Sequence, residues 1–274
     1  MSEQLRAGFI GLGSQGGPMA RAIVDAGFPT TLWARRPESL QAYADTAAHI
    51  AATPRELGAQ CDVVGVCVIN DADVDAVLRG PDGLLAGIAP GGVVLIHSTT
   101  RPETCIRLQE DFPAVHVLDA PVSGGGHRAA ARELLVMVGG DADVLARARP
   151  VLETFAHPLI HLGPLGSGQR AKLLNNALFT AQIGVAADAF AIGRAHGLDH
   201  DALSEVLRAG SGRSYAAEIV AAAREHLGGF AANAGSLLAK DVGILTALQA
   251  AEQSPLVVAA NTALDQLGVE RIEA

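Results

Sequence analysis

The sequence is poor in aromatic residues, which make up only 4% of its 274 residues. Cysteine is also scarce, since Cys61, Cys67 and Cys105 are the only three and their spacing matches no metal-ligand pattern. An odd number of thiols without a secretion signal is typical of the reducing cytoplasm. Because 49% of the residues are hydrophobic, we expect a substantial core built from Ala, Val, Leu and Ile, without a metal centre.

Dense runs of lysine and arginine are missing as well, and the formal net charge is −9. A nucleic-acid partner would require a basic face for its phosphates, so we expect no such partner. A small anionic ligand needs only a local pocket and is not excluded. The N-terminus has no basic-then-apolar leader, and no apolar run reaches roughly 18 residues. We therefore expect a cytoplasmic protein without a membrane span.

A glycine-rich segment follows the first expected strand, residues 6–10. It reads Gly11-Leu12-Gly13-Ser14-Gln15-Gly16, and apolar residues at helical spacing come after it. In the order strand, turn and helix, the first glycine permits a tight turn, the second lets the backbone approach a pyrophosphate, and the third lets helix pack on strand. The helix N-terminus then faces the phosphates. We interpret these residues as a dinucleotide site rather than an ordinary glycine-rich loop.

The second expected strand, Thr30–Trp33, has no acidic residue at its end. Proteins that bind NAD usually carry one there to hold the ribose 2′-hydroxyl. Here Ala34, Arg35 and Arg36 follow the strand. Two guanidinium groups attract a 2′-phosphate, which a carboxylate would repel. We predict NADP as the cofactor and consider NAD less suited; the alternative is that both arginines are solvated charges at a strand end.

Strand and helix patterns alternate as far as residue 162, and after residue 166 only helical patterns remain. This order predicts an α/β Rossmann-type N-terminal domain with a mostly parallel sheet, residues 1–163, and an all-α C-terminal domain, residues 164–274, joined by a long interdomain helix. The later strands are expected at 63–69, 93–96, 115–118, 134–138 and 158–162. The helices of the second half are expected at 172–196, 201–209, 216–226, 237–252 and 256–267.

Polar residues follow the apolar strands. The carboxyl ends of parallel strands converge at the crevice where such sheets bind ligands. Asn70 follows the strand at 63–69, and Thr99 follows the strand at 93–96. We expect both among the cofactor contacts, with the Thr99 hydroxyl at the nicotinamide half. His97 lies in the same segment, and we expect it to be structural rather than catalytic.

A second glycine-rich segment comes after Asp119-Ala120-Pro121-Val122. It consists of Ser123, Gly124, Gly125 and a third glycine. Such a run exposes backbone N–H groups and one hydroxyl, which suits a small anion such as a carboxylate. The alternative is a flexible glycine loop without a ligand.

The long helix begins within residues 166–176 and carries Lys172 and Asn176 four residues apart, hence on one face. Lysine can pass a proton and a carboxamide can orient an oxygen, so the two can hold a hydroxyl or carbonyl between them. The alternative is a solvated lysine and an ordinary polar helix residue. Lys240-Asp241, in an apolar helix, is either a surface pair or a lysine that reaches the cofactor.

Together these motifs resemble the β-hydroxyacid dehydrogenase family, which includes 3-hydroxyisobutyrate dehydrogenases and tartronate semialdehyde reductases and is related to 6-phosphogluconate dehydrogenase. The resemblance covers nearly the whole chain and rests on residues 8–13, 119–125 and 166–176 and on Lys240-Asp241. It implies dimers or tetramers formed through the helical domain. It also implies specific roles: Lys172 as catalytic acid/base, Asn176 orienting the reacting group, a substrate carboxylate at Ser123, Gly124 and Gly125, and cofactor contacts from Thr99 and Lys240.

Two positions depart from the family pattern: Gln15 replaces a methionine of the glycine motif, and Arg132 stands where the family often has glycine. Imine reductases share the architecture but generally replace the catalytic lysine, so Lys172 favours hydroxyl and carbonyl chemistry. We predict an NADP-dependent oxidoreductase that interconverts a small β-hydroxyacid and its semialdehyde or keto acid by hydride transfer. The alternatives are an imine reductase and a non-catalytic NADP-binding protein.

Overall fold

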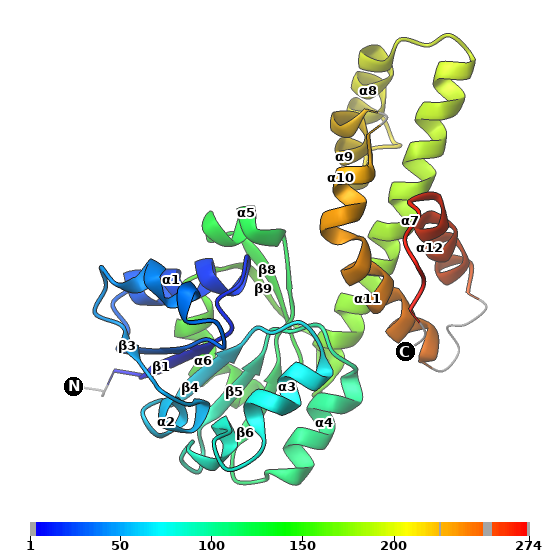
Figure 1. Cartoon of the computed structure of the whole chain (residues 1–274). Helices are drawn as coiled ribbons and strands as arrows, with labels where there is room; N and C mark the ends of the chain where they lie inside the picture. Colours follow the sequence, from blue (N-terminus) through cyan, green and yellow to red (C-terminus); the bar gives the residue numbers. More distant parts are fainter. Residues whose placement is uncertain (1–3, 225, 249–253, 273–274) are drawn as a thin grey trace. The chain divides into compact units, whose positions relative to one another are not determined.

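The computed structural model describes residues 4–224, 226–248 and 254–272. The chain divides into two compact units, one ending at Lys172 and the other beginning at Leu173. In Figure 1 the strands all lie in the blue-to-green first part of the chain, whereas the yellow-to-red part is helical. The division falls inside the long helix, while the sequence places it before that helix, between residues 163 and 164.

A six-stranded parallel sheet forms the centre of the first unit, in the strand order β3-β2-β1-β4-β5-β6. The prediction of an α/β fold with a mostly parallel sheet is confirmed. The strands are β1 (Ala7–Ile10), β2 (Thr30–Trp33), β3 (His49–Ile50), β4 (Val63–Val66), β5 (Val93–Ile96) and β6 (His116–Asp119).

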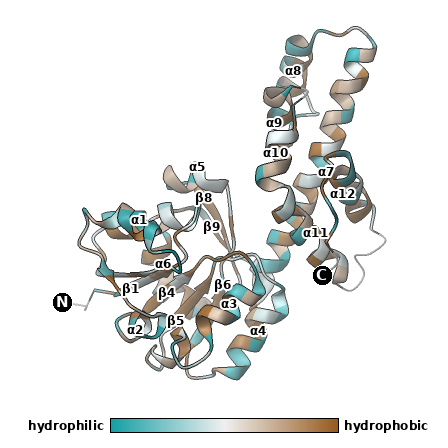
Figure 2. Cartoon of the chain, in the orientation of Figure 1, coloured by the Kyte–Doolittle hydropathy of each residue, from teal (hydrophilic) through white to brown (hydrophobic). Residues whose placement is uncertain are grey.

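Both faces of this sheet are buried, which explains the continuous apolar runs in the sequence. Alternate residues of one strand point to opposite faces. In β5, Val93 and Leu95 belong to one hydrophobic cluster, whereas Val94 and Ile96 belong to another. Figure 2 shows these central strands in brown, the colour of hydrophobic residues. A strand without polar positions is fully removed from water only when apolar side chains cover both faces of its sheet.

Three further strands form a separate small sheet. The sequence predicts strands at 134–138 and 158–162, but neither the third strand nor the separation from the main sheet. The three strands are β7 (Val122–Ser123), β8 (Leu134–Val138) and β9 (Ala156–His161), with β7 antiparallel and β9 parallel to β8. The helices of the first unit are α1 (Gly16–Asp25), α2 (Pro54–Ala59), α3 (Asp71–Leu78), α4 (Pro102–Asp111), α5 (Gly125–Ala130) and α6 (Ala142–Leu152), with short 3₁₀ helices η1 (Pro37–Tyr43) and η2 (Leu84–Ala86).

The second unit consists of helices, as the sequence predicts. Its elements are α7 (Ser167–Ala195), which starts in the first unit, then α8 (His200–Ala209), α9 (Tyr215–Ala223), α10 (Gly228–Phe230), the π-helical turn η3 (Ala231–Gly235), α11 (Ser236–Ala247) and α12 (Pro255–Gln266). The expected helix at 237–252 ends outside the described residues.

Small residues on α7 let its neighbours approach closely. Ala177 and Ala181 pack in one core cluster with residues of α11 and α12, and Phe190 packs in another with residues of α9. A Cβ atom at Gly184 would lie 2.6 Å from the Cβ of Ala263 in α12. In the described part of the chain, none of the helices has the length and apolar character needed to span a lipid bilayer.

Candidate active site

The glycine turn between β1 and α1 is shaped by two close backbone approaches. Gly11 has φ +92°, and a Cβ atom there would lie 2.1 Å from the carbonyl oxygen of Cys67. A Cβ atom at Gly16 would lie 2.0 Å from the carbonyl oxygen of Gly11. Side chains are therefore excluded at both positions by the fold itself. The turn follows β1 and approaches the end of β4, the neighbouring strand. The strand order of the sheet changes direction between these two strands, and doubly wound folds bind ligands at such a point.

Gly13 is different, because a Cβ atom there would meet nothing within 4 Å. Protein packing does not require glycine at this position, whereas a ligand that approaches the backbone would. The first turn of α1 contains no acidic residue, and the first N–H groups of a helix have no partner within it. With its neighbours Leu12, Ser14 and Gln15, the turn can accept a pyrophosphate.

A cavity of about 400 Å³ adjoins the turn. It brings Gly11, Leu12 and Gly13 together with Arg35 and Arg36 at the end of β2. Its volume lies in the range of small-molecule sites. A cavity lined by an open glycine turn and by two arginines suits an anionic dinucleotide.

Two residues of this region have functions that the sequence did not reveal. Asp73, in the first turn of α3, also lines the cavity, and its Oδ1 lies 3.0 Å from Nη1 of Arg35. Asn70, expected as a cofactor contact, caps α3: its Oδ1 accepts a hydrogen bond of 2.9 Å from the backbone N–H of Asp73. Asn70 is not among the residues that line the cavity.

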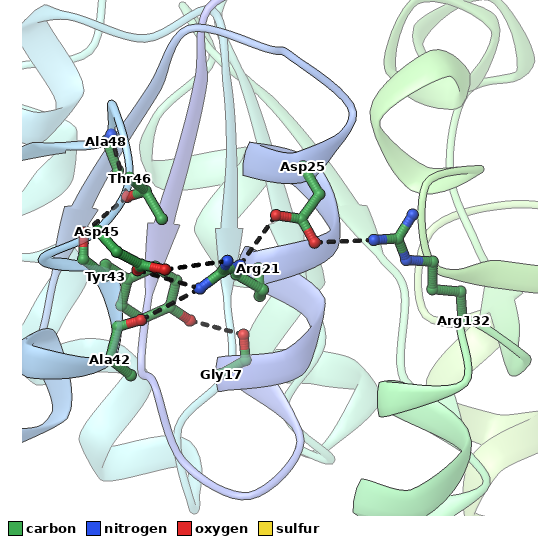
Figure 3. A network of polar contacts seen from close by, with 9 residues as sticks. All are labelled: Gly17, Arg21, Asp25, Ala42, Tyr43, Asp45, Thr46, Ala48 and Arg132. Atoms are coloured by element: carbon green, nitrogen blue, oxygen red, sulfur yellow. Dashed lines mark hydrogen bonds and ion pairs between the residues drawn. The ribbon is translucent and has the colours of Figure 1, made fainter.

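Arg132 is tied to the far end of α1. Its Nη2 donates a hydrogen bond of 2.8 Å to Asp25, which also accepts one from Arg21 (Figure 3). The backbone of Arg132 has φ +61°, a left-handed conformation in which glycine is strain-free. In this chain the arginine pairs with a carboxylate of α1.

The serine-glycine segment joins the end of a strand to the start of a helix. Ser123 ends β7, Gly124 has φ +135°, and Gly125 already begins α5. A Cβ atom at Gly126 would lie 2.8 Å from the carbonyl oxygen of Ser14. The segment therefore packs directly against the glycine turn, although the two are more than a hundred residues apart in the sequence.

A buried carboxylate fixes the start of α7. Asp119, at the end of β6, is fully buried. Its Oδ1 accepts a hydrogen bond of 2.7 Å from the N–H of Gly166, and its Oδ2 accepts one of 2.6 Å from the N–H of Gln169. Burial raises the pKa of Asp119, and these backbone donors oppose the rise. The carboxylate satisfies N–H groups that a helix start leaves without partners.

Gln169 extends this connection to the loop after β5. Its side chain is fully buried. The side-chain Nε2 donates to the carbonyl oxygen of Ser98 at 2.8 Å, and Oε1 accepts from the N–H of Thr100 at 3.1 Å. Both bonds flank Thr99, the expected cofactor contact. Lys172 is half-buried on α7, one turn beyond Gln169.

A second polar cluster lies in the helical unit. Nδ2 of Asn176 donates a hydrogen bond of 2.6 Å to Oδ2 of Asp241, and Nζ of Lys240 lies 2.8 Å from Oδ1 of the same carboxylate. Asp241 is only 3% exposed, so Lys240-Asp241 is not a surface pair. Oδ1 of Asn176 accepts from the side chain of Asn175. The amide of Asn176 is thereby held in one orientation.

His97 is structural in this fold, as the sequence suggests. It is 3% exposed and stacks on Phe9 with ring centroids 5.9 Å apart. Its Nδ1 lies 2.7 Å from the carbonyl oxygen of Ala120. Burial lowers the pKa of His97 to about 4, so the ring is neutral at pH 7 and donates from Nδ1. Among the described residues, no group of three or more His, Cys, Asp and Glu side chains could hold a metal ion.

Asp73, Asp119, Gln169 and Asp241 were absent from the expected site. Asp119 and Asp241 lie inside motifs that the sequence highlights, but nothing in the pattern tells which distant N–H or amide each carboxylate meets. Gln169 lies between the glycines and Lys172 without any signal of its own. Asp73 belongs to an acidic helix start, where a carboxylate is usually explained by the helix dipole alone.

Known protein families match both parts of this architecture. Residues 6–163 match the NAD binding domain of 6-phosphogluconate dehydrogenase. Residues 166–267 match the NAD-binding domain of NADP-dependent 3-hydroxyisobutyrate dehydrogenase. The fold and the glycine turn thus define a dinucleotide-binding protein with a helical second domain.

Individual relatives give the same result. The NAD-dependent L-serine dehydrogenase of Pseudomonas aeruginosa is 37% identical over 258 residues, which cover 90% of this chain and 85% of the relative. The structure of Mycobacterium tuberculosis 3-hydroxyisobutyrate dehydrogenase with L-serine has a TM-score of 0.85 at 29% identity. The match covers 99% of this chain and 96% of the chain in that structure. The structure of Psf3 with NADP+ and 2-OPP has a TM-score of 0.83 at 26% identity, and the match covers 95% of this chain and 93% of the Psf3 chain. The chain belongs to the β-hydroxyacid dehydrogenase family.

Proposed function

We propose that this protein is an NADP-dependent dehydrogenase that interconverts a small β-hydroxyacid and its semialdehyde or keto acid, with Lys172 as general acid/base. The observation that carries the proposal is the place of Lys172 on α7. Lys172 lies one helical turn after Gln169. The side-chain amide of Gln169 is hydrogen-bonded to the backbone of Ser98 and Thr100, the two neighbours of Thr99. The hydrogen bonds of Gln169 fix this part of α7, and the same chain has a cavity for a nucleotide. A lysine held in this way suits proton transfer next to a hydride-transfer site.

The proposed residues have three roles: they bind the cofactor, transfer a proton and orient the reacting oxygen. The turn at residues 11–16 holds the pyrophosphate, and Arg35 and Arg36 hold the 2′-phosphate. NADP, when bound, supplies or takes up the hydride. In reduction, the ammonium group of Lys172 donates a proton to the carbonyl oxygen; in oxidation, the neutral amine accepts the hydroxyl proton. The amide of Asn176, held by Asp241, orients the reacting oxygen.

The substrate is a small carboxylate. The family and the named relatives support this class: L-serine, which the P. aeruginosa relative's name specifies, is itself a β-hydroxyacid. We assign the substrate carboxylate to Ser123, Gly124 and Gly125, where the backbone turns through two positive φ angles at the start of α5. Backbone N–H groups and one hydroxyl there form a suitable anion cradle.

The cofactor assignment to NADP rests on the end of β2. Ala34 stands where an acidic residue would hold the ribose of NAD, and Arg35 and Arg36 line the cavity beside it. One relative is named as NAD-dependent and one related structure contains NADP+, so the family accommodates both. The arginines favour the phosphorylated cofactor in this chain.

We also propose a homodimer or homotetramer formed through the helical unit. Large apolar side chains recur along α7: Leu178, Val185 and Ile192, seven residues apart, are 50%, 65% and 55% exposed. Residues at this spacing lie along one side of a helix, and exposed apolar stripes of this kind support association. Light scattering coupled to gel filtration measures the assembly, and a monomer at micromolar concentration would contradict it.

The function is tested by following NADPH consumption, with NADH in parallel, against small aldehyde- and keto-acids. The panel includes succinic semialdehyde, methylmalonate semialdehyde, tartronate semialdehyde and glyoxylate, with one cyclic imine. Oxidation of L-serine and 3-hydroxyisobutyrate with NADP+ tests the reverse direction. We expect turnover of at least one acid, faster with NADPH. Turnover of the imine alone would replace the proposal by an imine reductase, and NADPH binding without any turnover would indicate a non-catalytic protein.

A further inference from the structure

A carboxylate reaches the nucleotide cavity from an unexpected element. The usual acidic residue at the end of β2 is missing, because Ala34 occupies that position. Asp73 of α3 nevertheless lines the same cavity as Arg35 and Arg36. The cavity that is to receive the 2′-phosphate is thus lined by one negatively charged and two positively charged side chains.

This carboxylate already binds one of the two arginines. Nη1 of Arg35 lies 3.0 Å from Oδ1 of Asp73, and the side chains are 73% and 20% exposed, respectively. The two partners differ in freedom. Asp73 belongs to the capped first turn of α3, where its N–H is bonded to Asn70, whereas Arg35 is a long side chain at the end of a strand, mostly in solvent. If the pair opens, the arginine is the partner that moves.

We propose that Asp73 is a specificity-determining residue for the cofactor, and that its carboxylate limits the preference for NADP over NAD. Two effects act in the same direction. The carboxylate competes with the 2′-phosphate for the guanidinium of Arg35, and its own charge repels the dianionic phosphate. NAD carries a neutral 2′-hydroxyl instead, so Asp73 neither repels it nor competes with it for Arg35. This inference rests on the proposed use of the cavity for NADP or NAD.

The neighbouring acidic residues of α3 do not share this position. Asp71 is bonded to the start of α4, where it accepts hydrogen bonds from the N–H of Arg101 and the hydroxyl of Thr104. Asp75 pairs with Arg79 at 3.0 Å and is not among the cavity residues. Asp75→Asn therefore removes the same charge from the same helix without altering the cavity, and is the matched control for Asp73→Asn.

The test is calorimetric titration of NADP+ and NAD+ into the full-length protein and the two variants, with melting temperatures to verify folding. In Asp73→Asn we expect the ratio of NADP+ affinity to NAD+ affinity to rise roughly three- to tenfold, as expected for a partly exposed charge pair. In Asp75→Asn the ratio stays within about twofold of the original, because solvent and salt screen the more distant charge.

An unchanged or lower ratio in Asp73→Asn, with binding intact, overturns this inference alone; a lower ratio would mean that Asp73 holds Arg35 ready for the phosphate. An equal rise in both variants also overturns it, because net charge rather than position would then be the cause. Absence of binding of either cofactor to the unaltered protein overturns the proposed function and this inference together. Binding is measured without turnover, so the result is independent of the substrate.

Discussion

The carboxylate of Asp119 accepts a hydrogen bond of 2.6 Å from the backbone N–H of Gln169. This bond joins the end of β6 to the first turn of α7, and the side chain of Gln169 continues the connection to the loop after β5. Three segments that are distant in sequence are thus fixed by two buried polar side chains. Lys172 lies on the next turn of the same helix, so its position depends on this junction.

Lys172→Met is expected to lower kcat by on the order of a hundredfold, the usual loss when a general acid/base is removed. The affinity for NADP+, measured by calorimetry, should stay nearly unchanged, because the cavity lies elsewhere in the first unit. Arg170→Met is the control: this exposed cation lies on the same helix and its loss should leave kcat nearly intact. Similar kcat losses in both variants would point to a general effect of charge.

Gln169→Met keeps the length of the side chain but removes both hydrogen bonds. The carbonyl of Ser98 and the N–H of Thr100 then lose buried partners, which should lower the free energy of unfolding by about 1–3 kcal/mol. We also expect kcat to fall roughly tenfold or more, since displacement of a catalytic group by about 1 Å is costly. The dissociation constant for NADP+ should change less than kcat. A stability loss with unchanged kcat would show that the residue supports the fold only.

Two alanine substitutions in the glycine turn separate ligand contact from packing. Gly13→Ala places a methyl group in open space, so the melting temperature should not change. Affinity for NADP+ should fall about tenfold or more, because the methyl group occupies the approach of the pyrophosphate.

Gly16→Ala is the contrasting variant, because its methyl group would lie 2.0 Å from the carbonyl oxygen of Gly11. It should destabilise the first unit by about 3 kcal/mol or more, measured by urea unfolding. If Gly13→Ala bound NADP+ as tightly as the original protein, the pyrophosphate would not lie over this turn.

Lys240→Met should destabilise the protein by about 3 kcal/mol, since it leaves the carboxylate of Asp241 buried beside Asn176 without its cation. The double variant Lys240→Met/Asp241→Asn should recover part of this loss, because the remaining group is neutral and its Oδ1 can still accept from Asn176. Urea unfolding of the two variants and of Asp241→Asn completes the cycle. Equal stabilities of Lys240→Met and the original protein would show that the pair is dispensable for folding.

His97 should make the protein less stable in acid. Its pKa is about 4 in the folded chain and about 6.5 when unfolded. Between these values the unfolded state binds the proton and the folded state does not, so stability falls as pH drops from 6.5 to 4, by about 3 kcal/mol from this residue. His97→Asn keeps a donor for the carbonyl of Ala120 without titrating. Its free energy of unfolding should therefore depend less on pH over this range, and equal pH dependence in both proteins would contradict the assignment.

Some strands follow from the sequence because their causes are local. The structure shows three strands at the expected bounds: Thr30–Trp33, Val93–Ile96 and Leu134–Val138. For the last two, an apolar run with polar or glycine flanks is enough to define a buried strand. The strand expected at 63–69 ends at Val66, because periodicity does not show where pairing with a neighbour stops. The helix α5 was missed because glycine has low helix propensity.

The sequence by itself determined the class of fold, the glycine turn and the positions of Lys172 and Asn176 on one helix, since these depend on patterns within a few residues of the chain. Only the tertiary structure decided which distant groups meet them. It brought Asp119 to the N–H groups of Gly166 and Gln169 at the start of α7, Asp73 to Arg35, and Asp241 to Asn176. Which partner a carboxylate meets depends on the path of the whole backbone. That path is set by the packing of the sheet in the first unit and of the helices in the second, rather than by the residues beside the carboxylate.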